Sequence, residues 1–162
     1  MSPVYLDHNA TTPLRSEVRE HWLGTLDALA GNPSSLHAAG RAARHVLDAA
    51  RERAAAALGV HEEELVFTSG GTEANNLAVL GAVRAGTGPA RVVTTAIEHS
   101  SVLGPARRAE REGHELRVVG VDAEGLPDLE RIAAEALGAP RAVVAVMAAN
   151  NCTGQATAAI QM

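Results

Sequence analysis

A glycine pair followed by threonine is the part of this sequence best suited to hold an anion. Residues 67–76 place a short apolar segment before Gly70 and Gly71, and an apolar helical segment after them. The backbone N–H groups of Gly71 and Thr72 would point at a bound anion, aided by the helix dipole, and the Thr72 hydroxyl adds another donor. The alternative is an ordinary strand-to-helix turn with Thr or Ser as N-cap. A dinucleotide fingerprint is excluded, because G-x-G-x-x-G is absent.

His99 is the second candidate, in the polar segment 95–101 that directly follows an expected strand. Ligands of open α/β sheets sit at the carboxyl ends of strands. An imidazole at that place can stack on a planar ring and exchange protons near neutral pH. The alternative for a histidine in a loop is a solvated or helix-capping residue.

Two asparagines, Asn150 and Asn151, follow the apolar run 142–149 and form the third candidate. Their amides suit a phenolate oxygen or a carboxylate, and the alternative is a polar turn. The neighbouring Cys152 is expected to be a buried small hydrophobic residue. Three polar loops after successive strands would converge on one rim of a sheet, which favours a binding site there.

The elements that must position these loops alternate along the chain. Short β-rich runs at 65–68, 91–96, 116–121 and 142–147 predict strands, the last one buried on both faces. Helices are expected at 15–29, 38–58, about 72–85, 100–112 and 127–137. This pattern predicts an α/β fold with a mostly parallel sheet flanked by helices and right-handed crossovers.

Composition restricts the classes of function. The 162 residues carry a net charge of −5, so neither nucleic acid nor a membrane is an expected partner. No signal peptide or membrane span is predicted, and a single cysteine fits the cytoplasm. The seven histidines lack ligand spacing, so no metal site is expected. All 14 basic residues are arginine, and therefore no lysine is present to form a Schiff base.

Five ordered motifs carry a family resemblance across essentially the whole chain. They are residues 5–13 (YLDHNATTP), 31–35 (GNPSS) with His37 and Gly40, 68–73 (TSGGTE) with Asn76, Glu98-His99, and Asn150-Asn151. In order and spacing these motifs resemble those of the cysteine desulfurases, within the class V aminotransferase group. The resemblance implies part of the large domain of a fold type I enzyme that uses pyridoxal 5′-phosphate (PLP), with an N-terminal segment at 1–14 and the partial large domain at 15–162.

The resemblance also implies roles for individual residues. Gly71 and Thr72 would bind the cofactor phosphate, and His99 would stack on the pyridine ring and serve in acid–base steps. Asn151 would contact the phenolic oxygen of the cofactor or the substrate. In the intact family, L-cysteine gives L-alanine while sulfur passes to an enzyme persulfide and on to an acceptor protein. Such enzymes are homodimers that serve iron–sulfur cluster biogenesis.

Departures from the family pattern limit what this chain can do alone. Cys152 stands where the family usually has glutamate, and the aspartate, Schiff-base lysine and sulfur-accepting cysteine of the family would all lie further along. We therefore expect an N-terminal fragment that is inactive alone. A fragment of a selenocysteine lyase or another class V member remains open, and so does a non-catalytic degenerate module. The 65–68 strand is expected to lack its usual neighbours, while the other three strands pair and leave an exposed sheet edge.

Overall fold

The computed structural model describes residues 4–157, and these fall into two compact units that divide between Phe67 and Thr68. The expected division into 1–14 and 15–162 stays a prediction. Within the described part, no helix is both long and apolar enough to cross a membrane.

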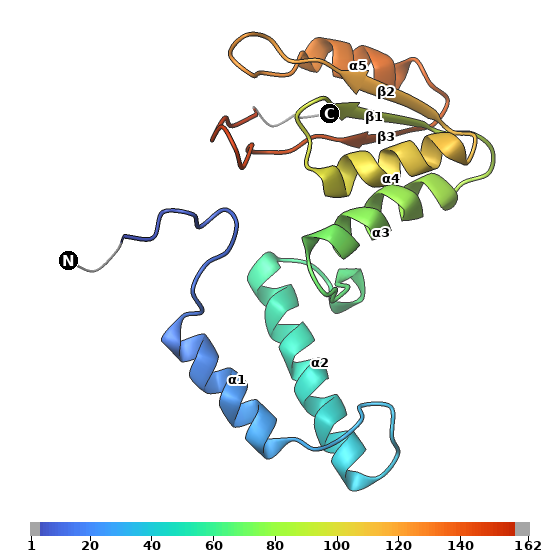
Figure 1. Ribbon diagram of the computed structural model, residues 1–162. Helices are drawn as coiled ribbons and strands as arrows, with labels where there is room; N and C mark the ends of the chain where they lie inside the picture. Colours follow the sequence, from blue (N-terminus) through green and yellow to red (C-terminus); the bar gives the residue numbers. More distant parts are fainter. Residues whose placement is uncertain (1–3, 158–162) are drawn as a thin grey trace. The chain divides into compact units, whose positions relative to one another are not determined.

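The first unit consists of α1 (Ser16–Ala28), α2 (Ala38–Leu58) and the short 3-10 helix η1 (Glu62–Glu64), labelled in part in Figure 1. The α2 helix begins at His37, whose side chain accepts from the Gly40 amide, and ends at Gly59 in the left-handed conformation, φ 69°. A Cβ atom on Gly40 would lie 2.2 Å from the Ser35 carbonyl oxygen, so only glycine fits the start of α2. Both helices match the expected ranges.

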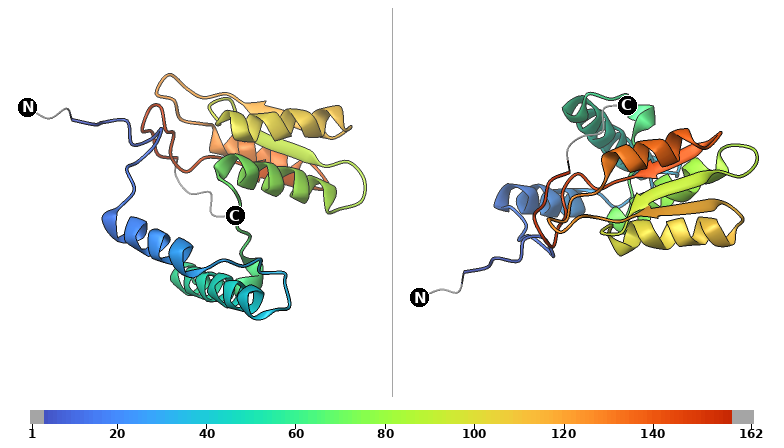
Figure 2. Two further views of the ribbon diagram at one scale, coloured as in Figure 1. Left: turned by 60° about the horizontal axis from the view of Figure 1, so that its bottom comes forward. Right: turned by 90° about the horizontal axis from the view of Figure 1, so that it is seen from above.

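The second unit is a three-stranded parallel sheet between helices. Strands β1 (Arg91–Thr95), β2 (Glu115–Val119) and β3 (Ala142–Ala145) lie in the order β2-β1-β3. The helices are α3 (Gly71–Arg84), α4 (Ser100–Arg111) and α5 (Leu129–Leu137). The right-hand view of Figure 2 shows the strands separating α4 from α5.

Alternation along β1 divides the core between the two faces of the sheet, because successive side chains of a strand point to opposite faces. Val92 packs with apolar residues of α3 and α4, whereas Val93 packs with Val119 and with Ile132 of α5. Ala106 and Ala109 of α4 are fully buried against the Val92 side. The expected α/β class is confirmed, and the carboxyl end of β1 is held from both faces.

The expected strand at 65–68 is wrong, since this segment forms no strand. Both edges of β1 are already occupied by β2 and β3, so β1 offers the segment no place in the sheet. Instead, the Arg51 guanidinium donates to the Leu65 carbonyl and lies 4.8 Å from the centre of the Phe67 ring. The expectation that the segment lacks strand neighbours while the other three strands pair is confirmed.

The sequence predicts that the last strand is buried on both faces, but β3 is half-buried, so this expectation is wrong. Among the described residues it pairs with β1 alone, and β2 likewise pairs only with β1. Both outer strands therefore present unpaired backbone groups. In the first unit, α1 buries no residue, and Val18, Trp22 and Leu26 are each more than half exposed.

Candidate functional site

The turn before α3 leaves backbone donors open. The α3 helix has Gly70 as its N-cap and no side chain caps it, so the expected alternative of a Ser or Thr N-cap is wrong. Ser69 does not cap the helix, because its amide and its hydroxyl both donate to the Glu73 carboxylate at 2.7 Å. These bonds lower the pKa of Glu73.

The amides of Gly71 and Thr72 therefore have no protein acceptor within residues 4–157. The first N–H groups of a helix have no partner inside the helix itself, and in α3 the Ala74 amide is the one that reaches the Gly70 carbonyl. Space around the turn is open, since a Cβ atom on Gly70 or Gly71 would meet no atom within 4 Å. Such a turn can accept an anion.

His99 caps the helix that follows β1. It is the N-cap of α4, and its Nδ1 accepts from the Ser101 amide at 3.1 Å and lies 2.7 Å from the Ser101 hydroxyl. The capping role that the sequence left open is therefore real, but it uses only Nδ1. Among the described residues Nε2 has no partner, and His99 is an exposed residue. The ring can cap the helix and contact a ligand at the same time.

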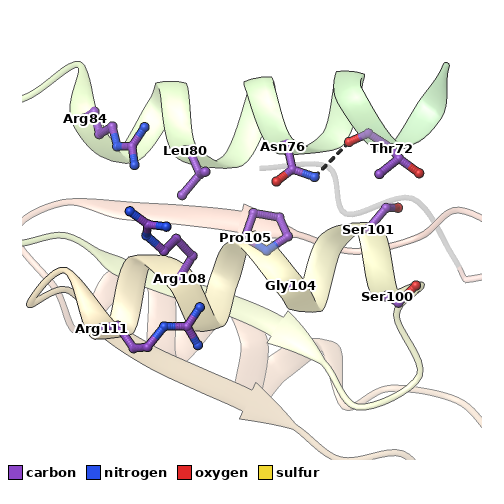
Figure 3. Close-up of a pocket in the computed structure, with 10 residues that line it drawn as sticks. All are labelled: Thr72, Asn76, Leu80, Arg84, Ser100, Ser101, Gly104, Pro105, Arg108 and Arg111. Carbon is purple, nitrogen blue, oxygen red and sulfur yellow. Dashed lines mark hydrogen bonds between the residues drawn. The ribbon is translucent and has the colours of Figure 1, made fainter. Parts of the chain in front are cut away.

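Asn75 ties this cap to the helix that carries the open amides. Its Nδ2 donates to the Ser101 hydroxyl at 2.8 Å, and Ser101 is only 6% exposed. The N-termini of α3 and α4 consequently lie at the same end of the unit, as Figure 3 shows from the positions of Thr72, Ser100 and Ser101.

Glu98, beside His99, joins two strand ends. Glu98 is 8% exposed, and its Oε1 accepts from the Thr95 hydroxyl at 3.0 Å and from the Met147 amide at 2.7 Å. Thr95 ends β1 and Met147 lies just beyond β3. The buried carboxylate thus fixes the loop after β3 relative to the loop that bears His99.

Asn150 adds a second link between the loop after β3 and the loop that bears His99. Its Nδ2 donates to the Ile97 carbonyl at 3.1 Å, while its Oδ1 accepts from the amides of Cys152 and Thr153. Because the Asn150 side chain fills the inside of this turn, Cys152 is exposed, and the expectation of a buried cysteine is wrong. Asn151 is exposed at the tip of the same turn.

A groove of about 410 Å³ runs between α3 and α4. Thr72, Ser100 and Ser101 line one end, and the guanidinium groups of three arginines lie towards the other end (Figure 3). Asn76 lies between the two ends and donates to the Thr72 carbonyl at 2.9 Å. The arginines are Arg84, Arg108 and Arg111, and the first two are bonded to Glu112.

Hydrogen bonds thus connect the segments that carry the predicted site residues. Asn75 and Ser101 link α3 to His99, and Asn150 links the Asn151 turn to the His99 loop through Ile97. Asn75 and Ser101 were not among the residues predicted for the site, and the connecting roles of Glu98 and Asn150 were not predicted either. Their signal was polar side chains within or beside the three motifs.

The residues present fit part of a PLP molecule. Open amides at a helix N-terminus suit its phosphate, and the exposed imidazole ring of His99 suits its aromatic ring. The covalent link would need an amine, and the chain contains no lysine. Within residues 4–157, no group of three His, Cys, Asp or Glu side chains could hold a metal ion.

Comparison with known proteins agrees with the motifs. The family model for aminotransferase class-V matches residues 4–161. The chain is 42% identical to the cysteine desulfurase IscS of Dictyoglomus turgidum over 93% of its own length and 38% of the relative's. It is 40% identical to the putative cysteine desulfurase IscS 1 of Bacillus subtilis, over 95% of its length and 41% of the relative's.

Solved structures give the same result. A NifS-like protein from Rickettsia africae matches with a TM-score of 0.79 and 32% identity over 95% of this chain and 42% of that chain. A structure of SspA in complex with cysteine matches with a TM-score of 0.82 and 29% identity over 94% and 44%. The chain spans about two fifths of the relatives it matches. Membership of the aminotransferase class-V family implies the use of PLP. This chain belongs to that family, and it matches the N-terminal part of the cysteine desulfurases.

Proposed function

We propose that this chain provides the phosphate- and ring-binding part of a PLP-dependent enzyme that resembles the cysteine desulfurases. In this proposal Gly71 and Thr72 bind the cofactor phosphate. The observation that carries it is the N-terminus of α3, where both amides lack a protein acceptor among the described residues and the turn is open. A phosphate there would accept two N–H bonds and the Thr72 hydroxyl, aided by the helix dipole.

The other two predicted residues act on the ring and its oxygen. His99 stacks on the pyridine ring, since its Nδ1 is anchored to the α4 N-terminus and the residue is exposed. Asn151, at the tip of the turn that Asn150 holds, contacts the phenolic oxygen or the substrate. When bound, the cofactor supplies an electron sink for the amino-acid substrate.

The substrate and partners follow from the relatives. Two curated relatives are named cysteine desulfurases, and a solved relative was obtained with cysteine, so L-cysteine or a related amino acid is the proposed substrate. A sulfur-acceptor protein and a homodimer belong to the same proposal, as does a place in iron–sulfur cluster assembly. Because this chain has no lysine, it holds the cofactor only through non-covalent contacts.

The test is a titration of the 162-residue chain with PLP, with pyridoxal and with inorganic phosphate. The amide signals of Gly71 and Thr72 in ¹H–¹⁵N spectra report the binding. PLP and phosphate should shift these signals and slow their hydrogen exchange, whereas pyridoxal, which lacks the phosphate, should not. Thr72→Val should weaken PLP binding roughly tenfold or more, since hydrogen bonds to charged groups are the strong ones.

Two further variants sharpen the result. Gly71→Pro removes one amide at the first residue of α3, where a helix tolerates proline, and should also weaken binding. Thr87→Val makes the same change as Thr72→Val at an exposed position beyond the other end of α3 and should leave binding unchanged. Amide signals at Gly71 and Thr72 that ignore PLP and phosphate would overturn the assignment of the phosphate site.

A further inference from the structure

The hydrogen bonds around His99 determine where its ring carries a hydrogen. Two donors of Ser101 face Nδ1, the backbone amide at 3.1 Å and the hydroxyl oxygen at 2.7 Å. The amide can only donate, so Nδ1 must offer it a lone pair. A neutral imidazole has one bare and one protonated nitrogen, and a bare Nδ1 places the hydrogen on Nε2.

The direction of the hydroxyl bond follows from Asn75. The Asn75 Nδ2 group donates to Ser101 Oγ at 2.8 Å, so this oxygen already accepts one hydrogen bond. Its own hydrogen is then available for the nearest remaining acceptor, which is His99 Nδ1 at 2.7 Å. Since Ser101 is 6% exposed, water has little access to compete for that hydrogen.

We propose that Ser101 and Asn75 are positioning residues that hold neutral His99 in the tautomer with hydrogen on Nε2. Asn75 orients the Ser101 hydroxyl, and that hydroxyl together with the Ser101 amide occupies Nδ1. The neutral ring consequently offers a hydrogen-bond donor at Nε2, while its one in-plane lone pair, on Nδ1, faces Ser101.

The consequence for chemistry rests on the proposed function. Against a bound cofactor or amino acid, His99 in this form donates a hydrogen bond through Nε2 and does not accept a proton there. An acid–base role for neutral His99 would need proton uptake at Nδ1, which displaces the Ser101 donors. The tautomer itself is a property of this chain without any ligand.

The experiment is a long-range ¹H–¹⁵N spectrum of the imidazole nitrogens in the ligand-free 162-residue chain, recorded at pH about 8.5, where an ordinary imidazole is neutral. The His99→Gln variant identifies the His99 signals. The expected result is a protonated Nε2 and a bare Nδ1. A protonated Nδ1, or an even mixture of the two forms, would overturn the proposal.

Variants test the two positioning residues separately. Ser101→Ala removes the hydroxyl and should lower the ratio of the Nε2–H to the Nδ1–H form roughly 2- to 10-fold, the effect of one ordinary hydrogen bond. Asn75→Asp supplies an acceptor for the Ser101 hydroxyl and should shift the ratio in the same direction. Ser100→Ala changes the neighbouring serine, for which no bond to His99 exists among the described contacts, and should change nothing.

Amide spectra of each variant establish that the fold is retained, and the unmutated chain tests the tautomer even if a variant fails to fold. An unchanged ratio in both folded variants would refute the positioning role. Repeating the spectrum with PLP separates the two proposals. Absence of any PLP effect on His99 contradicts the proposed function and leaves the tautomer result standing.

Discussion

The buried carboxylate of Glu98 should be a large contributor to the stability of the second unit. Its Oε1 accepts from the Thr95 hydroxyl and from the Met147 amide, and Thr95 is completely buried. Hydrogen bonds to a charged group contribute roughly 1.5–3 kcal/mol each. Glu98→Ala removes both and leaves two donors without their acceptor, so we expect a loss of about 2–4 kcal/mol after water enters the site.

Glu98→Gln is the milder variant. It keeps an oxygen that can accept both bonds but removes the charge, and should cost about 1–2 kcal/mol, the difference between charged and neutral hydrogen bonds. Glu124→Ala, at an exposed position of the same unit, is the matched control and should stay within about 0.5 kcal/mol of the unmutated chain.

The assay is urea unfolding followed by far-UV circular dichroism, with hydrogen exchange at the Met147 amide as a local measurement. The alanine variant should lower the unfolding midpoint and speed exchange at Met147, because that amide loses its acceptor. If whole-domain stability proves too small for the alanine variant to fold, the glutamine variant gives the measurement. A Glu98→Ala chain as stable as the Glu124→Ala control would refute the reasoning.

Three other predictions concern charge, covalent chemistry and association. Arg84 and Arg108 lower the pKa of Glu112 to about 2 from 4.5, so its contribution to stability should be present above pH 4.5 and lost as the pH falls towards 2; thermal melts should show that Glu112→Gln removes this part of the pH dependence. With its N-terminal amine blocked, the chain treated with PLP and borohydride should carry no cofactor by mass spectrometry, because it has no lysine; a modified side chain would contradict this. With two outer strands each paired on one side, the chain should associate or melt broadly; a monomer on size-exclusion chromatography with a sharp cooperative melt would show the opposite.

Hydrophobic periodicity and turn-forming residues predicted the helices and strands whose formation depends on the local sequence. All five helices and the strands β1, β2 and β3 lie within a few residues of their expected ranges, because amphipathic periods and glycines such as Gly59 act locally. The 65–68 segment has the composition of a strand but no partner, and pairing depends on residues distant in sequence. Composition alone could not predict that β2 and β3 would occupy both edges of β1 and leave the 65–68 segment unpaired.

The candidate site divides in the same way. The open amides before α3 were predictable from Gly70, Gly71 and Thr72, since helix termini leave donors unpaired. The exposure of Cys152 was not, because it depends on the Asn150 side chain turning inward to bond two amides of its own loop. A cap through Nδ1 and an exposed Nε2 on one histidine likewise require three-dimensional contacts.

The strand order has a consequence for the sequence of folding events. β1 meets β2 after a loop of 24 residues, as the Arg91–Glu115 pair shows, but meets β3 only after 51, as Thr94 and Ala145 show. Doubling a loop adds about 0.6 kcal/mol of closure entropy, so the parallel β1-α4-β2 crossover forms at lower entropic cost than the pairing of β1 with β3. During synthesis the crossover also leaves the ribosome first.

We therefore expect β3 to be the last strand to join the sheet, and its pairing with β1 can be lost without breaking the β1–β2 pair. Its departure breaks the Glu98–Met147 bond and frees the turn that bears Asn151. The His99 cap and the α3 amides depend on none of these contacts and belong to the earlier-formed part. We therefore expect the candidate site to form in two stages, with the residues proposed to hold the phosphate and the ring positioned before Asn151.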